Sequence, residues 1–226
     1  MRIGILQTGH SPDEVRDDLG DYGQMFIRLL DGHGYDFTIY SVVDNQFPDG
    51  PDAADGWLIT GSKHGAYEDH DWIAPLEKLV RDIRDADLPL VGVCFGHQII
   101  AQALGGKVQK FDGGWAVGRQ VYEIDGEKIA LNAWHQDQVV DLPEGARVFA
   151  SNDFCENAGL MIGDKIMTIQ PHPEFTAQMI DALIKYRGRG NISEDVLSKA
   201  QDGLAQVIDT QKFADQMAKI LNKGDR

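Results

Sequence analysis

The sequence contains only two cysteines, and it has no apolar run long enough to cross a bilayer. Two cysteines that form no C-x-x-C pair exclude a disulfide framework, which would need a larger, paired set. The first residues, MRIGILQTGHSPDEVRDD, reach acidic sequence too early for the apolar segment of a secretory leader. These absences predict a soluble protein of a reducing compartment, and we expect a cytoplasmic location.

The sequence is also poor in basic residues, with 21 Lys and Arg against 36 Asp and Glu and a net charge of −15. Phosphate backbones and anionic membrane surfaces attract the opposite sign, so we expect neither a nucleic-acid nor a membrane partner. The chain has no G-x-x-x-x-G-K-[ST] segment and no convincing G-x-G-x-x-G segment. Because these loops cradle phosphates, their absence argues against nucleotide binding, and we expect no cofactor.

Short apolar segments alternate with segments of helical periodicity in the first half of the chain. Strands are predicted at 3–8, 35–43, 56–62 and 88–94, and helices at 22–30, 72–83 and 95–104. This alternation predicts an α/β fold with an open, mostly parallel sheet and helices on both faces. The 226 residues suit one large domain or two small ones.

The pattern changes between residues 107 and 170, where short strands and hairpin signals replace the helices. IDGE at 124–127 and IGDK at 162–165 are turn sequences, which predict an antiparallel edge or subsheet. Helices return at 175–186, 192–203 and 210–221, and Asn191 and Asp209 are the expected N-caps of the last two. The apolar residues after position 186 predict packing of these helices on the core, and a lid or a dimer contact is left open. These residues are Val196, Leu197, Leu204, Val207, Phe213, Met217, Ile220 and Leu221.

Gly92-Val93-Cys94-Phe95-Gly96 places a cysteine between two glycines where a strand meets a helix. This G-x-C-x-G pattern is the thiol form of the nucleophile elbow, in which glycines relieve crowding around a strained residue. The helix that follows favours a thiolate at Cys94, and the N–H of Phe95 would stabilise an oxyanion. The alternative is a buried structural cysteine, because free cysteines are among the most buried residues.

QPHPEF at 170–175 supplies a second candidate, because an extended His172-Pro173-Glu174 places its two ionisable side chains on one strand face. Glu174 would then orient the imidazole of His172, completing a set of thiol, base and carboxylate. The alternative is a surface histidine followed by a helix-starting glutamate. Thr60-Gly61-Ser62 ends a predicted strand at the sheet edge where ligands bind, and the Gly61 N–H would serve as a second oxyanion donor.

With these segments together, the chain resembles the class I (triad-type) glutamine amidotransferases. The segments that carry the resemblance are TGS, GVCFGHQIIAQALGG, WHQDQV at 134–139 and QPHPE, in the order of the family. The resemblance implies a flavodoxin-like fold in a single domain, 1–226, with a motif-bearing core at 1–186 and a helical extension at 187–226.

The resemblance also implies roles for the residues that match the family motifs. Cys94 would attack the γ-carboxamide of a glutamine-like substrate, His172 would move the proton, and Glu174 would orient His172. A γ-glutamyl thioester would form and water would release glutamate, with Gly61 and Phe95 as the oxyanion donors.

The same family motifs imply a substrate pocket beside the elbow. Gln98 matches the glutamine-binding position, and His135 and Asp137 match a loop that lines the pocket. Trp134 departs from the small residue usual in that loop, which would suit a larger γ-glutamyl group.

Three functions remain open. The segments SKHGAYEDHDW, CFGHQIIAQALGG and GWAVG resemble a stand-alone branch that includes γ-glutamyl peptidases, and this favours a free-standing hydrolase. The second is a glutaminase subunit that supplies ammonia to a separate synthase, as in two-chain GMP synthases. The third is a non-catalytic regulatory relative. Homo-oligomerisation is left open by the sequence.

Two further sets of residues are given structural roles. His64, Asp69, His70 and Asp71 lie in a polar loop without the spacing of a defined ligand set, so we expect a solvated loop and no metal. Cys155 lies in a strand-like segment with no base nearby, which favours a structural role.

Overall fold

The computed structural model describes residues 1–224. Its central feature is a nine-stranded sheet in the order β2-β1-β3-β4-β11-β10-β9-β6-β7. The first five strands in this order are mutually parallel. They are β2 (Asp36–Tyr40), β1 (Arg2–Leu6), β3 (Gly56–Ile59), β4 (Leu90–Val93) and β11 (Ile166–Ile169). The predicted parallel sheet is confirmed, and each of the four strands predicted in the first half of the chain overlaps one of these elements.

The remaining four strands of this sheet are antiparallel to their neighbours. They are β6 (Ala116–Ile124), β7 (Glu127–His135), β9 (Ala146–Ser151) and β10 (Gly159–Ile162). Asp125 and Gly126 connect β6 to β7 with φ angles of 47° and 84°, which is the backbone that a tight hairpin requires. The expected antiparallel strands therefore extend the main sheet itself. A separate two-stranded sheet pairs β5 (Lys107–Lys110) with β8 (Asp137–Asp141).

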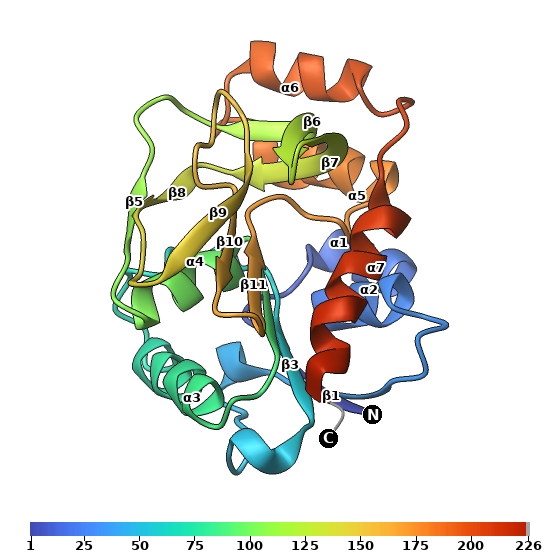
Figure 1. Cartoon of the computed structure of the whole chain (residues 1–226). Helices are drawn as coiled ribbons and strands as arrows, with labels where there is room; N and C mark the ends of the chain where they lie inside the picture. Colours follow the sequence, from blue (N-terminus) through green and yellow to red (C-terminus); the bar gives the residue numbers. More distant parts are fainter. Residues whose placement is uncertain (225–226) are drawn as a thin grey trace.

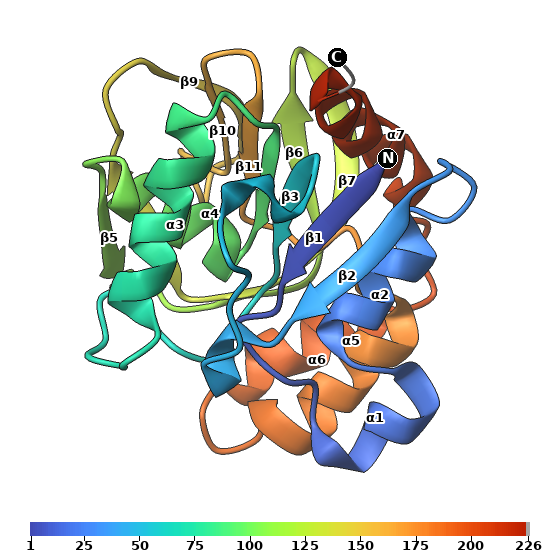
Figure 2. The same cartoon turned by 90° about the horizontal axis from the view of Figure 1, so that it is seen from below.

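Helices cover both faces of the parallel strands (Figures 1 and 2). On one face α3 (Ile73–Asp85) and α4 (Phe95–Ala103) pack against alternate strand residues such as Trp57 and Ile59. On the other face α2 (Tyr22–Leu29) and α7 (Thr210–Leu221) pack against the residues of opposite parity, among them Ile3, Ile5 and Leu58. The side-chain alternation of each strand thus divides the core into two layers.

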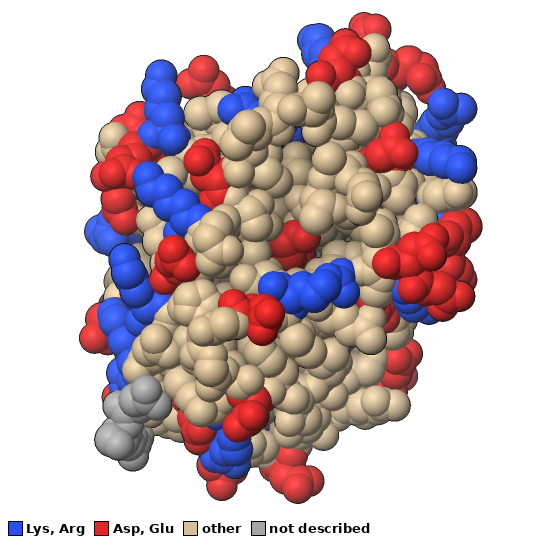
Figure 3. All heavy atoms as spheres, turned by 90° about the vertical axis from the view of Figure 1, so that its right-hand side faces the viewer, with Lys and Arg blue, Asp and Glu red and all other residues tan. Residues whose placement is uncertain are grey.

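Short helical elements complete the fold. They are α1 (Asp13–Leu19), α5 (Ala177–Leu183), a π-helical turn (Ile184–Gly188), α6 (Glu194–Asp202) and the 3₁₀ turns Val42–Asp44, Pro51–Ala53 and Asn222–Gly224. Helix α1 could not be predicted from sequence, because it buries no residue and so has no apolar period. On the face shown in Figure 3, basic and acidic side chains are interspersed, which spreads the net negative charge.

Two predictions about the C-terminal helices are wrong in detail. Ser193, rather than Asn191, is the N-cap of α6. Asp209 is the N-cap residue of α7, as expected, and its carboxylate accepts a hydrogen bond from the N–H of Ala130 at 2.8 Å. Val207, expected to pack on the core, has an exposed fraction of 81% because it lies in the connection between the helices.

That the helical extension at 187–226 folds as one domain with the rest of the chain remains a prediction. The packing of α7 on the core makes it testable. Phe213 is 1% exposed and packs in the same cluster as Ile3 and Ile5 of β1. Phe213→Ala is expected to lower the free energy of unfolding by about 3–5 kcal/mol. Val207→Ala is the exposed control and should change it by about 0.5 kcal/mol or less. Urea unfolding followed by tryptophan fluorescence and circular dichroism should give one coincident transition; a separate early transition in F213A would show an independent extension.

Candidate active site

Cys94 lies in the turn between β4 and α4 with backbone angles φ 54° and ψ −104°. A non-glycine residue at positive φ is strained, and such residues concentrate at functional sites. The Cys94 N–H donates to the carbonyl of Ile169 at 2.8 Å, which ties the turn to β11. A Cβ at Gly92 would lie 2.5 Å from the carbonyl oxygen of Gly96, so the close approach of these two residues requires glycine. The structure thus has the predicted geometry of the elbow.

His172 and Glu174 are hydrogen-bonded to each other at the end of β11, in a buried position. His172 Nδ1 lies 2.6 Å from Glu174 Oε1, and the imidazole stacks on Phe175 with centroids 3.8 Å apart and an angle of 3°. The predicted extended backbone is wrong, because residues 172–175 form a turn in which the Phe175 N–H donates to the His172 carbonyl at 3.4 Å. Pro173 favours this turn, since its fixed φ suits the second turn position.

Gly61 shows how close Cys94 and His172 lie. A Cβ built on Gly61 would be 2.8 Å from His172 Cε1 and 3.7 Å from Cys94 Cβ. Burial lowers the pKa of His172, but the Glu174 carboxylate and the nearby Cys94 sulfur raise it by more, and the resulting pKa is about 10. The imidazole therefore favours its protonated form beside the sulfur. Three segments far apart in the sequence meet at the carboxyl edge of the parallel strands.

The two predicted oxyanion donors belong to segments that hydrogen bonds hold in place. Phe95 begins α4, where the first N–H groups have no acceptor within the helix. The next residue, Gly96, donates its N–H to the carbonyl of Thr60 at 3.1 Å, joining the elbow to the end of β3. The hydroxyl of Thr8 donates to the Gly61 carbonyl at 3.0 Å. Gly61 is therefore held by Thr8, which follows β1, and its neighbour Thr60 is held by α4.

The predicted pocket residues divide into two groups. Gln98 is buried, and its Nε2 donates to the Asp137 carbonyl at 3.0 Å and to Gln170 Oε1 at 3.1 Å. His135 Nδ1 donates to the same carbonyl at 3.2 Å, and burial lowers the pKa of His135 to about 3. Trp134 points to the opposite side of β7, because neighbouring strand residues alternate, and it packs edge-on against Trp115 at 6.2 Å.

One supporting residue was missed by the sequence analysis. The carbonyl of Asn132 accepts the His172 N–H at 2.7 Å, and its side-chain amide donates to the Phe175 carbonyl at 2.8 Å. Asn132 thus fixes both ends of the turn that carries the imidazole. Because this contact comes from an isolated bridge between β7 and residue 172, no local motif could have indicated it.

Three buried polar atoms near these residues have no hydrogen-bond partner within residues 1–224. They are Glu174 Oε2, His135 Nε2 and Gln170 Nε2. Glu174 Oε2 belongs to the carboxylate bonded to His172, and Gln170 is the residue whose Oε1 accepts from Gln98.

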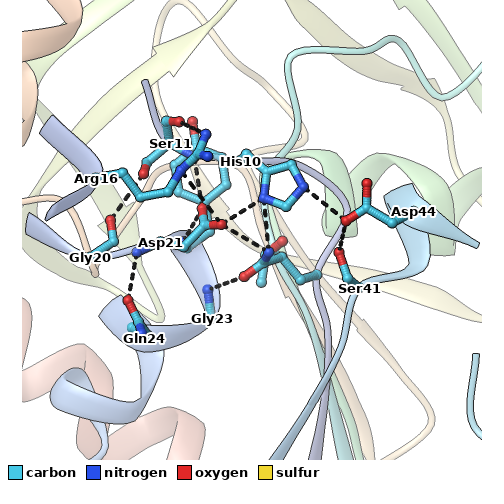
Figure 4. Close-up of polar contacts among 12 residues, drawn as sticks. His10, Ser11, Arg16, Gly20, Asp21, Gly23, Gln24, Ser41 and Asp44 are labelled. Atoms are coloured by element: carbon cyan, nitrogen blue, oxygen red, sulfur yellow. Dashed lines mark hydrogen bonds and ion pairs between the residues drawn. The ribbon is translucent and has the colours of Figure 1, made fainter. Parts of the chain in front are cut away.

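A second polar network lies at the end of β1 (Figure 4). His10 Nδ1 lies 2.6 Å from Asp21 Oδ2, and its Nε2 lies 3.0 Å from Asp44 Oδ2. Burial lowers the pKa of His10, but the two carboxylates raise it above its ordinary value. Gln7 joins the network through Asp21 at 3.1 Å and accepts the Gly23 N–H at 2.9 Å. The network therefore anchors the start of α2 to β1.

Only part of the metal-ligating set considered from sequence comes together. Within residues 1–224, the one group that could hold a metal ion is formed by His64, His70 and a residue that the sequence analysis left out, Glu68. Asp69 and Asp71 lie outside this group.

Comparison with known proteins identifies the family. Residues 18–186 match the family described as "Glutamine amidotransferase class-I". The chain belongs to this family. Among curated class-I relatives, γ-glutamyl peptidase 3 of Arabidopsis thaliana is 33% identical over 200 residues, covering 81% of the chain and 80% of the relative. A glutamine-hydrolysing GMP synthase subunit from Halobacterium salinarum is 32% identical over 170 residues, covering 71% and 87%.

Two solved structures share the fold of this chain. A glutamine amidotransferase from Methylobacillus flagellatus has a TM-score of 0.74 at 19% identity, covering 99% of this chain and 94% of that one. A second, from Thermotoga maritima, has a TM-score of 0.74 at 21% identity, with coverage of 99% and 97%. The family and the fold expected from sequence are confirmed.

Glu174→Gln tests the electrostatics of the site around His172. The pKa of His172 in the folded protein, about 10, lies above its ordinary value of 6.5. The stabilisation from its proton is thus complete below pH 6.5 and is lost as the pH rises towards 10. In E174Q the pKa of His172 should fall by about 1–3 units. Proton NMR of the imidazole would measure this fall.

Stability measurements over the same pH range provide the control. Urea unfolding of wild type should show stability declining across this window, with a flatter profile in E174Q. Glu144→Gln removes an exposed carboxylate and should keep the wild-type profile. An unchanged His172 titration in E174Q would contradict the assigned cause.

Proposed function

We propose that the chain is a thiol hydrolase that cleaves γ-glutamyl amide bonds, with Cys94 as nucleophile, His172 as acid and base, and Glu174 as the group that orients His172. The observation that supports this proposal is the packing of Gly61 against both Cys94 and His172. A thiol, an imidazole bonded to a carboxylate, and a backbone amide lie around one point, which is the arrangement that acyl transfer needs.

The reaction follows from these positions. The sulfur attacks the γ-carbonyl carbon, and the N–H groups of Gly61 and Phe95 stabilise the negative oxygen. The C–N bond breaks as His172 gives its proton to the departing amine, which leaves a γ-glutamyl thioester on Cys94. His172 then takes a proton from water, the hydroxide attacks the thioester, and the C–S bond breaks to release glutamate and restore the thiol.

The raised pKa of His172 supports the first step of this mechanism. A protonated imidazole beside the sulfur carries the proton that the departing amine must receive. Both cysteines of the chain are free and buried, which suits a reducing compartment, and we infer that the reaction takes place in the cytoplasm.

The leaving group is best matched by an amino acid or peptide amine. γ-Glutamyl peptidases of Arabidopsis thaliana cover most of the chain, with γ-glutamyl peptidase 4 spanning 92% of it at 31% identity. The second candidate is a glutaminase subunit, favoured by the 32% identity to the Halobacterium salinarum GMP synthase subunit. That candidate requires a separate synthase partner. Trp134 lies on the other side of β7 from His135 but packs against the cluster that contains Phe175, and we propose it as a contact for the larger leaving group.

Purified protein distinguishes these functions. We expect hydrolysis of γ-glutamyl dipeptides with a kcat/KM above that for glutamine, and a loss of about 10⁴-fold or more in Cys94→Ala. Cys155→Ala should retain activity, and mass spectrometry should find a glutamine-like electrophile attached to wild type but not to C94A. Glutaminase activity that appears only with an added synthase would favour the subunit function. Absence of both turnover and labelling would leave the non-catalytic alternative.

Gly61→Ala tests the close packing at the site. The added Cβ would lie 2.8 Å from His172 Cε1, so the imidazole must move away from the sulfur. A displacement of this size should lower kcat about 100-fold. Gly50→Ala is the control, because its Cβ would meet only the movable carboxylate of Asp52 at 3.1 Å. Steady-state kinetics that gave equal kcat values for G61A and G50A would contradict the assigned geometry.

A further inference from the structure

The loop between β3 and α3, residues 62–72, folds back on itself through successive backbone hydrogen bonds. The Glu68 N–H donates to the Gly65 carbonyl at 3.1 Å, the His70 N–H to the Glu68 carbonyl at 3.2 Å, and the Ile73 N–H to the His70 carbonyl at 3.0 Å. These turns bring the side chains of His64, Glu68 and His70 to one point. The convergence therefore follows from an ordered backbone.

The three side chains direct their donor atoms at a common centre. One ligand atom from each of His64, Glu68 and His70 lies within 4.8 Å of the others. Glu68 Oε2 is 3.3 Å from His64 Nδ1 and 2.7 Å from His70 Nε2. The side chains are 22%, 43% and 34% exposed in chain order, so a dissolved ion can reach them from solvent.

Aromatic contacts fix the two imidazoles in this orientation. Trp72 is only 4% exposed. The His70 ring stacks on it with an angle of 8°, and the His64 ring meets it edge-on at 66°, each with centroids 5.9 Å apart. The two imidazoles are themselves 4.2 Å apart. Ligands held in place before an ion arrives lose little conformational freedom on binding it.

We propose that His64, Glu68 and His70 form a binding site for one divalent transition-metal ion, with Zn²⁺ as the best match. Two imidazole nitrogens and one carboxylate oxygen are a ligand set that Zn²⁺ accepts, whereas Mg²⁺ and Ca²⁺ prefer oxygen alone. Three protein ligands leave at least one coordination position for water.

A bound ion would stabilise the loop that borders the Cys94 site. Trp72 packs on Phe95 with centroids 5.4 Å apart, and Phe95 follows Cys94 directly. Gly61 precedes the first residue of the same loop. The metal site is argued from its own geometry and does not rest on the proposed hydrolase function.

The test uses full-length Cys94→Ala, because the thiol and imidazole of the neighbouring site would themselves bind Zn²⁺. Protein freed of metal by a chelator is titrated with Zn²⁺ in a calorimeter and with Co²⁺ in a spectrophotometer. We expect one ion per chain, and visible Co²⁺ absorption without a sulfur charge-transfer band. A C94A protein that binds no stoichiometric ion at Kd values below about 100 µM would overturn the proposal.

Variants in the same C94A background locate the ion. His64→Ala/His70→Ala should weaken Zn²⁺ binding by at least about 100-fold. His33→Ala is the matched control, because His33 also faces a carboxylate, Asp215 at 3.6 Å, and it should bind as tightly as C94A alone. If circular dichroism shows that the double variant is unfolded, Glu68→Gln is used in its place. We expect this variant to bind Zn²⁺ about 10-fold more weakly. Equal affinity in a folded ligand variant and the H33A control would also overturn the proposal.

Discussion

The parallel pairing of β4 with β11 is the constraint on which the site depends. β4 ends immediately before Cys94, β11 ends shortly before His172, and the Cys94 N–H bonds to the last residue of β11 at 2.8 Å. Because parallel neighbours end at the same edge of a sheet, this pairing delivers the sulfur and the imidazole to one place. The turn of Pro173 and the stacking of Phe175 then set the orientation of the ring.

Contacts on three sides hold the backbone of Cys94 in its strained conformation. The positive φ of this residue costs free energy, and the surrounding structure must over-determine it. β11 fixes the Cys94 N–H, Thr60 accepts the Gly96 N–H, and the helix that begins at Phe95 continues from the turn. Glycines at 92 and 96 allow these backbones to approach. Stability in the core thus maintains a conformation that the turn alone would not adopt.

The sequence was most informative where local chemistry determines structure. The elbow glycines, the hairpin turns and the buried strands all follow from residues close together in the chain, and they predicted the parallel sheet and the place of Cys94. The bond between His172 and Glu174 was anticipated, although its turn backbone was not. Asn132 and Glu68 could not be predicted, because their importance arises only when β7 reaches residue 172 and the 62–72 loop folds back. Asn191 and Val207 were misjudged for a related reason, since capping and burial depend on how the helices are joined.

The position of α7 has a consequence for the order of events during synthesis. This helix is the last long element of the chain, yet Phe213 and Met217 cover the same core layer as Ile3 and Ile5 of the first strand. Although α2 covers part of this layer, the early strands keep the rest of it uncovered until α7 has been synthesised and docks. The docking of α7 is thus the step that removes this apolar surface from contact with other chains.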